Sequence, residues 1–299
     1  MNRSLQVIRD IYKPYRYTIK GKVSILETTS GTIVVKESER DLQEVYRYLN
    51  SRNFTLFPKL IDDSRVGIHV FPFIVDTKIP SEQKAQDMMD IIASLHLKTT
   101  YYKTVSQDTY QEIYEMVESN IVYLQQYYEG WFDLYFQEVY HAPSHYFFMR
   151  DVSKILASLS FAKQELDDWF SIVRDSEKQR VCFIHNNLSL DHYLKGEDQD
   201  YFISWDQSKI DSPVLDLLGF YQKEYFDLDF QSLFTRYQEK FPWNEGEKKL
   251  FFVLISLPKK VTFTDSEFEN CRMLRECLDY LYKTESLVRP YYAIEQKQE

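Results

Sequence analysis

The sequence predicts an α+β fold with two lobes: a small β-rich lobe with one helix at residues 1–75, and a larger, mainly helical lobe at residues 76–299. Three observations lead to this prediction. Short runs of β-branched residues dominate the first part of the chain, helical periodicity dominates the rest, and two apolar strands joined by a polar turn interrupt the helices after residue 180. A chain of 299 residues is long enough for such a two-lobed fold.

The β-rich lobe is predicted from short strand-forming segments near the start of the chain. Residues 17–19 and 32–35 are rich in β-branched and aromatic side chains, and glycines separate them. Residues 39–49 then have the spacing of a helix, and residues 66–75 favour two closely spaced strands. These segments give a small lobe of several strands and one helix.

Helical periodicity begins at Ser81. A first helix is predicted from apolar residues at i, i+3, i+4 and i+7, namely Met88, Ile91, Ile92 and Leu95. A second helix spans residues 107–128, and Glu129–Gly130 should end it because glycine favours helix termini. Further helices are predicted at residues 131–141, 147–174, 228–240, 245–257 and 265–283.

The composition restricts the possible partners. The chain has 36 Lys and Arg against 46 Asp and Glu, a net charge of −10, which argues against non-specific binding to nucleic acid or to anionic membranes. It also has 24 Tyr and 21 Phe, an unusually high content. Tyr suits protein interfaces, because its ring is apolar and its hydroxyl forms hydrogen bonds, although each single ring is more simply interpreted as part of the core.

The cysteines indicate neither zinc nor a disulfide framework. Cys182, Cys271 and Cys277 are odd in number and lack the paired spacing of zinc ligands. No apolar run has the length of a signal peptide at the start of the chain or of a membrane span elsewhere. We therefore expect a protein that is made, and at least at first kept, in the cytoplasm of the producing cell.

The most informative segment is residues 181–206. An apolar strand leads into a polar turn that begins at His185, a second short strand follows, and a third apolar segment ends at Trp205–Asp206. This order of strand, polar turn and strand is typical of the loop with which kinases hold a catalytic base and magnesium ligands next to ATP.

Residue by residue, the segment resembles the aminoglycoside phosphotransferase and choline kinase superfamily, whose loop reads His-x-Asp, then Asn, then Ile-Asp-Trp. His185 matches the His. Asn187 stands where that pattern has the catalytic Asp, His192 where it has the metal-binding Asn, and Ser204 where it has the main magnesium-binding Asp. Residues 211–217 resemble the family's Gly-Asp-Pro-x-x-Asp-Leu run, which implies a structural role for Asp216. The resemblance implies the protein kinase-like fold and covers roughly residues 15–285.

The same resemblance suggests a vestigial nucleotide site in the small lobe. Lys36 follows the strand at residues 32–35 and is similar to the kinase lysine that pairs with ATP phosphates; Glu44 would be its ion-pair partner. Residues 70–74 would be the hinge. A lysine at the end of a strand is equally compatible with a solvated edge. No glycine cluster precedes Lys36 to bring backbone N–H groups close to phosphate.

The three departures from the pattern predict a degenerate kinase. The amide of Asn187 cannot accept a proton as a carboxylate does, and a hydroxyl with an imidazole is a poor exchange for Asp plus Asn around magnesium. We therefore expect no cofactor. Asp206 and Asp191 leave an alternative open, in which these carboxylates hold magnesium and ATP for a divergent phosphotransferase that acts on a small hydroxylated or amine-bearing molecule.

Within the superfamily the chain most resembles the CotS-type spore-coat proteins of endospore-forming bacteria. That resemblance implies a pseudokinase with a structural or scaffolding role in the spore coat, and other coat proteins as partners. A module that senses a small molecule or nucleotide without turning it over is a third interpretation. Asn187 and Ser204 distinguish only the phosphotransferase from the other two.

Overall fold

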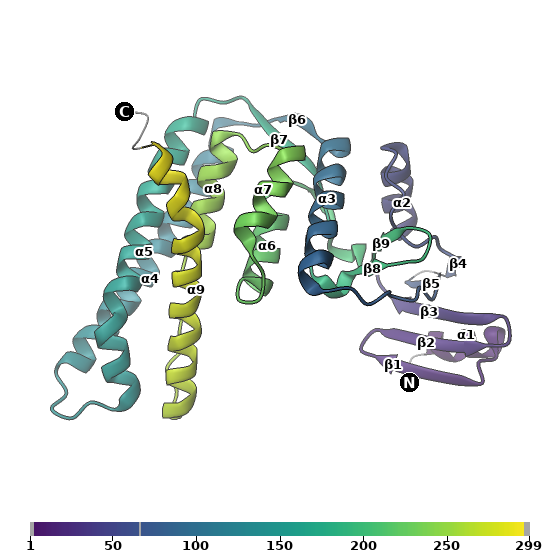
Figure 1. Ribbon diagram of the computed structural model, residues 1–299, viewed down its shortest axis with the longest axis horizontal. Coiled ribbons are helices and arrows are strands. Elements are labelled where there is room, and N and C mark those ends of the chain that lie inside the picture. Colours follow the sequence, from purple (N-terminus) through teal and green to yellow (C-terminus); the bar gives the residue numbers. More distant parts are fainter. Residues whose placement is uncertain (1–2, 66, 296–299) are drawn as a thin grey trace. The chain divides into compact units, whose positions relative to one another are not determined.

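The computed structural model describes residues 3–65 and 67–295. The chain forms two compact units. Unit 1 comprises the described residues up to Thr99 together with Phe183–Ile210, and unit 2 comprises Thr100–Cys182 and the described residues from Asp211 onward. An antiparallel sheet dominates unit 1 and long helices dominate unit 2 (Figure 1), which confirms the predicted α+β fold. The lobe boundary after residue 75 stays a prediction.

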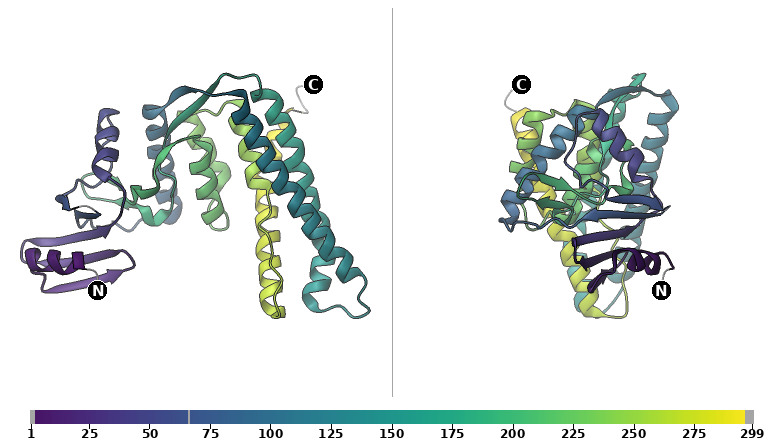
Figure 2. Two further views of the ribbon diagram at one scale, coloured as in Figure 1. Left: turned by 180° about the vertical axis from the view of Figure 1, so that it is seen from behind. Right: turned by 90° about the vertical axis from the view of Figure 1, so that its right-hand side faces the viewer.

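Unit 1 is built on a five-stranded antiparallel sheet with the strand order β1-β2-β3-β5-β4. The strands are β1 (Arg16–Lys20), β2 (Val23–Thr28), β3 (Gly31–Glu37), β4 (Asp62–Arg65) and β5 (Ile68–Pro72). Burial alternates along β2, so one face of the sheet is buried, and α1 (Arg3–Tyr12) covers that face through the buried side chain of Ile8 (Figure 2). The first residue of the segment predicted as two strands, residue 66, lies outside the described residues.

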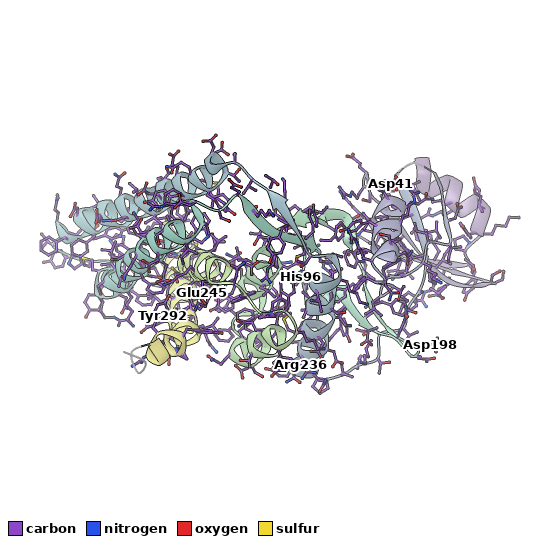
Figure 3. The ribbon with its side chains drawn as sticks, turned by 90° about the horizontal axis from the view of Figure 1, so that it is seen from above. Asp41, His96, Asp198, Arg236, Glu245 and Tyr292 are labelled. Atoms are coloured by element: carbon purple, nitrogen blue, oxygen red, sulfur yellow. The ribbon has the colours of Figure 1, made fainter. Side chains whose placement is uncertain are left out.

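Two helices complete the N-terminal part of unit 1. The carboxylate of Asp41 accepts hydrogen bonds from the backbone N–H groups of Gln43 and Glu44 and so caps α2 (Leu42–Ser51). The helix predicted from Ser81 is α3 (Ser81–Thr99), and its His96 side chain is fully buried (Figure 3). A buried His96 agrees with a structural role.

The segment singled out by the sequence forms a series of short elements. These are β7 (Lys178–Ile184), the 3-10 turn η1 (Leu190–His192), β8 (Tyr193–Lys195), β9 (Asp200–Phe202), the 3-10 turn η2 (Trp205–Gln207) and β10 (Lys209–Asp211). Strands β8 and β9 form a hairpin in which Tyr193 pairs with Phe202. Gly196 is required in its turn, because a Cβ there would lie 2.5 Å from the carbonyl oxygen of Gln199.

Long helices make up most of unit 2. They are α4 (Gln107–Phe136), α5 (Pro143–Val173), α6 (Val214–Glu224), α7 (Phe230–Lys240), α8 (Glu245–Ser256) and α9 (Glu267–Glu295), and β6 (Tyr101–Thr104) pairs with β7. Helix α5 packs along α4, α8 and α9, as the views of Figures 1 and 2 show. Among the described helices, none combines the length and the apolar character that a membrane crossing needs.

The predicted helix ends at residues 128 and 283 were wrong, and residues 131–136 continue α4 instead of starting the separate helix predicted at residues 131–141. Gly130 does not end a helix: α4 continues to Phe136, and nothing lies within 4 Å of the position of a Cβ at Gly130. Packing of the apolar face of α4 against α5 therefore outweighs the helix-breaking tendency of one glycine, a cost of about 1 kcal/mol. Helix α9 extends to Glu295 rather than ending at residue 283, and the sequence did not indicate α1 or α6.

Candidate functional site

His185 is a scaffold residue of the loop. Its ring is fully buried, its Nε2 donates a hydrogen bond to the carbonyl oxygen of Ile203 (2.8 Å), and the ring centroid lies 4.8 Å from that of Trp205 in an edge-on contact. These contacts connect the end of β7 to the segment that follows β9. His185 thus fixes the position of the loop and has no exposed ring atom to offer a substrate.

The two polar positions of the turn contact each other. His192 Nδ1 donates to the backbone carbonyl of Asn187 at 2.8 Å, which leaves Nε2 as the acceptor of the neutral ring. The Ser189 hydroxyl accepts from the backbone N–H of Asp191 (3.3 Å) and caps η1. The turn thereby holds Asn187 and His192, the two residues predicted at the catalytic and metal positions, in contact with each other.

Lys36 and the residues after β9 come together in unit 1. The Lys36 ammonium forms an ion pair with Asp206 and lies 3.4 Å from the Ser204 hydroxyl. Ser204 adopts the left-handed backbone conformation (φ 66°, ψ 48°), which begins the turn η2 and carries Asp206 toward Lys36. Lys36 was predicted for the nucleotide site, and Asp206 was predicted for the alternative metal site. The structure places these two side chains in contact.

The expected ion pair between Lys36 and Glu44 was wrong. Within the described residues, the Lys36 ammonium contacts Asp206 and Ser204, whereas Glu44 is exposed in the first turn of α2. The physical reason is that Asp206 supplies a partly buried carboxylate beside Lys36, where an ion pair is screened less by solvent than at the exposed surface of α2.

The surroundings of Asp206 favour its charged form. Burial raises the pKa of this carboxyl, but hydrogen bonds from Lys36 and Ser38, together with the positive charge of Lys36, lower it more, so that it lies below the usual value. Tyr46 lies on the same side of the unit, and burial, followed by the negative charge of Asp206, raises the pKa of its hydroxyl. At neutral pH the site therefore holds an ionised Asp206 and a neutral Tyr46.

The residues present do not fit a magnesium ion as the family pattern would hold it. In favour of a metal, Asp206 Oδ1 is buried and has no hydrogen-bond partner among the described residues. Against it, Asp191 is exposed, and no group of three or more His, Cys, Asp or Glu in residues 3–65 and 67–295 is placed to hold a metal. One buried carboxylate oxygen and one hydroxyl fall short of the near-octahedral oxygen shell that magnesium demands.

A cavity of ≈760 Å³ in unit 1 opens beside Lys36. Its lining comes from β1 to β3, from α2, from residues 71–74 within the predicted hinge at residues 70–74, and from the turn around His192. Lys36, Asp191, His192 and Ser204 line it, so the structure brings four of the nine predicted site residues to one cavity.

Asp216 and Cys182 belong to unit 2. Asp216 is buried in the first turn of α6, and its predicted structural link to the catalytic loop stays a prediction. Cys182 is fully buried in β7, and burial raises the pKa of its thiol, as expected for an inert core cysteine.

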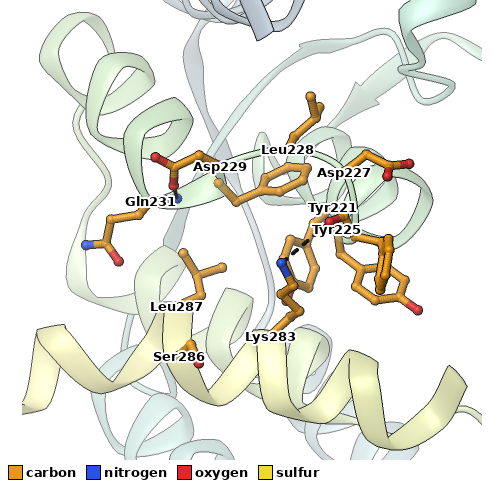
Figure 4. A pocket seen from close by; sticks show the side chains of 11 residues that line it. Tyr221, Tyr225, Asp227, Leu228, Asp229, Gln231, Lys283, Ser286 and Leu287 are labelled. Atoms are coloured by element: carbon orange, nitrogen blue, oxygen red, sulfur yellow. Dashed lines mark hydrogen bonds between the residues drawn. The ribbon is translucent and has the colours of Figure 1, made fainter. Parts of the chain in front are cut away.

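A separate cavity of ≈360 Å³ lies between the α6–α7 turn and α9 (Figure 4), where Lys283 Nζ donates to the Phe226 carbonyl at 3.5 Å. It contains none of the predicted site residues.

The fold is that of the aminoglycoside phosphotransferases. The chain superposes on an aminoglycoside phosphotransferase from Alicyclobacillus acidocaldarius with a TM-score of 0.69 at 11% identity, over 95% of this chain and 92% of that one. It also superposes on a spectinomycin phosphotransferase in an AMP-bound complex, with a TM-score of 0.56 at 12% identity, over 94% and 97% of the two chains. No protein-family model matches the sequence, and no curated protein matches it either. At these sequence identities the structural similarity establishes the class of fold. The activity has to be inferred from the residues of the site.

One feature of the site was missed at the level of sequence, namely that Lys36 and Asp206 form a pair. No local sequence signal connects these two residues, which lie 170 positions apart. Trp205, which precedes Asp206, is fully buried in the core.

The Asp206–Lys36 pair makes a pH-dependent contribution to stability. We expect Asp206→Asn to lower the free energy of unfolding at pH 7 by about 1–3 kcal/mol, the range for hydrogen bonds to charged groups. Because the pKa of Asp206 is lower in the folded chain, the contribution is fully present above the unfolded value of about 3.9 and is lost as pH falls through the folded pKa. Urea unfolding of both proteins at neutral and at acidic pH would check this; an equal difference at both would contradict it.

Proposed function

We propose that this protein is a pseudokinase, a protein with the aminoglycoside phosphotransferase fold that does not transfer phosphate efficiently. The observation that carries the proposal is the content of the loop: it has Asn187, His192 and Ser204 at the positions where the resemblance implies a catalytic base and magnesium ligands. The contact of His192 with the Asn187 carbonyl supports it, because it gives this turn a stable arrangement that involves no metal.

The chemical consequence is the loss of two separate contributions. A carboxylate base next to the substrate hydroxyl contributes about 10²–10⁴-fold to the rate, and the neutral amide of Asn187 cannot provide it. Stabilisation of the transferring phosphoryl group needs bound metal ions, and the Ser204 hydroxyl and the His192 imidazole are poor ligands for magnesium. Either loss alone would slow the reaction strongly.

The proposal predicts that the purified protein hydrolyses ATP in magnesium or manganese no faster than buffer, and that it phosphorylates no member of a panel of amino sugars, amino alcohols and polyols. The measurement is release of labelled phosphate together with transfer to the panel. As a matched control, the triple variant Asn187→Asp/His192→Asn/Ser204→Asp restores the family pattern and should gain metal-dependent hydrolysis if its circular dichroism matches the wild type.

Metal-dependent turnover by the wild type that disappears in Asp206→Ala would overturn the proposal and favour the second candidate function, a divergent ATP- and magnesium-dependent phosphotransferase for a small hydroxylated or amine-bearing substrate. One observation favours that candidate. Asp206 combines a buried Oδ1 that has no hydrogen-bond partner in the described residues with a position next to Lys36 and Ser204.

For the biological setting we propose a structural or scaffolding role in the spore coat of an endospore-forming bacterium, with other coat proteins as partners. This step rests on the resemblance to CotS-type proteins, and the abundance of Tyr, with 24 residues, suits docking to other proteins. Deletion of the gene in the producing bacterium should change the protein composition or the resistance of the coat. A deletion strain with a normal coat would refute this role while leaving the pseudokinase proposal untouched.

A further inference from the structure

We propose that the cavity beside Lys36 binds an uncharged ring compound and disfavours anionic nucleotides, so that it has reversed the charge preference of a kinase site. The inference rests on the proposed function, because a site that turned over ATP would have to hold its phosphates. It states which class of ligand the cavity binds. Three features of the cavity and its neighbouring turn support it.

The first feature is the apolar wall of the cavity. Strands β2, β3, β5 and β8 and the residue after β9 contribute aliphatic and aromatic side chains to the lining. They are Val23, Ile25, Val34, Phe71, Leu194 and Ile203. Walls of this kind favour burial of a flat apolar or aromatic ring.

The second feature is the balance of charge. The charged residues of the lining are Lys20, Lys36, Asp76 and Asp191, two of each sign. Lys36 is paired with Asp206, and Asp76 with Lys84 at 2.8 Å. The remaining two, Lys20 and Asp191, are exposed and of opposite sign, and exposed charges are strongly screened. Among the described residues that line the cavity, Lys36 is therefore the partly buried cation, and the Asp206 carboxylate already neutralises it.

The third feature is the short turn that joins β1 and β2, two strands that contribute to the lining. Lys20 pairs with Val23, so β1 and β2 are joined by the two residues Gly21 and Lys22, with Gly21 at φ +58°. So short a turn has few backbone N–H groups to direct at a phosphate, unlike the longer glycine-rich loops that bind anions. The lining also contains the hydroxyl groups of Tyr46 and Ser204, which can form hydrogen bonds with an uncharged ligand.

The test compares adenosine with ATP, which share base and sugar and differ in charge. Calorimetric titration without metal should give tighter binding of adenosine than of ATP by the wild type. Asp206→Asn frees Lys36 while keeping the side-chain shape; it should raise the affinity for ATP by about 10-fold or more, because the ion pair no longer competes, and leave adenosine binding within about 3-fold. Lys36→Met in the same background should remove the gain.

Tighter binding of ATP than of adenosine by the wild type would overturn the inference, as would a failure of adenosine to bind at millimolar concentration. An unchanged ATP affinity in Asp206→Asn would also overturn it, since the ion pair would then not control selectivity. A different measurement would refute the pseudokinase proposal, namely metal-dependent turnover by the wild type as described above. ATP preference without turnover therefore refutes only this inference, and turnover refutes the function on which it rests.

Discussion

Trp205→Ala is expected to lower the free energy of unfolding by about 3–5 kcal/mol, the range for removal of a large buried aromatic side chain. Trp205 is 0% exposed and lies among the rings of Phe54, Phe183 and His185, with centroids at 6.0, 6.3 and 4.8 Å. Its Nε1 also donates to the carbonyl oxygen of Phe202 at 2.9 Å. Urea unfolding followed by circular dichroism measures the loss.

Two variants separate the causes of that loss. Trp205→Phe keeps a ring in the core but leaves the Phe202 carbonyl without this donor, so we expect a smaller loss than for Trp205→Ala. Tyr140→Ala changes an aromatic residue that is 92% exposed and should alter stability by no more than about 0.5 kcal/mol. If Trp205→Ala were as mild as Tyr140→Ala, the ring cluster would not be the core of the loop region.

Local patterns in the sequence were sufficient to predict the class of fold and most of its helices. The spacing of Met88, Ile91, Ile92 and Leu95 marks α3 because periodicity reports directly which face of a helix is buried. The end of α4 could not be predicted in this way. Gly130 has the local preference of a helix terminus, but the neighbours of α4, which decide whether the helix continues, are distant in sequence.

For the candidate site, too, the sequence predicted the features that local patterns determine and missed those that depend on tertiary contacts. The loop from His185 to Asp206 could be located from its order of strands and turns, and four of the predicted site residues line one cavity. The partner of Lys36 could not be predicted, because 170 residues separate it from Asp206 and no local rule connects them. The resemblance pointed to Glu44, and that analogy fails because the Lys36 ammonium pairs with Asp206 instead.

The Lys36–Asp206 pair has a simple physical interpretation. A partly buried lysine ammonium is costly unless an acid pairs with it. Asp206 supplies that acid in this chain. Under the ligand preference that we propose for the cavity, the same ion pair also reduces the attraction of Lys36 for nucleotide phosphates.

The largest effect in unit 2 should come from Arg180→Met, with an expected loss of about 3–5 kcal/mol in the free energy of unfolding. The guanidinium forms a buried ion pair with Glu247, with Arg180 Nε 2.8 Å from Oε1 and side chains only 14% and 8% exposed. Arg180 also donates to the Pro242 carbonyl at 2.8 Å and lies over the ring of Phe241. Removing it leaves the Glu247 carboxylate buried without its cation.

The control is the double variant Arg180→Met/Glu247→Leu, which removes both charges and should recover much of the loss, because two apolar side chains carry no desolvation penalty. Part of the loss should remain, since Glu247 also completes the cap of α8 by accepting from the backbone N–H of Asn244 at 3.1 Å. A double-mutant cycle from urea unfolding gives the coupling energy. If the double variant were no more stable than Arg180→Met, the loss would come from the cap and from packing on Phe241, and the carboxylate would not be a buried charge that needs its partner.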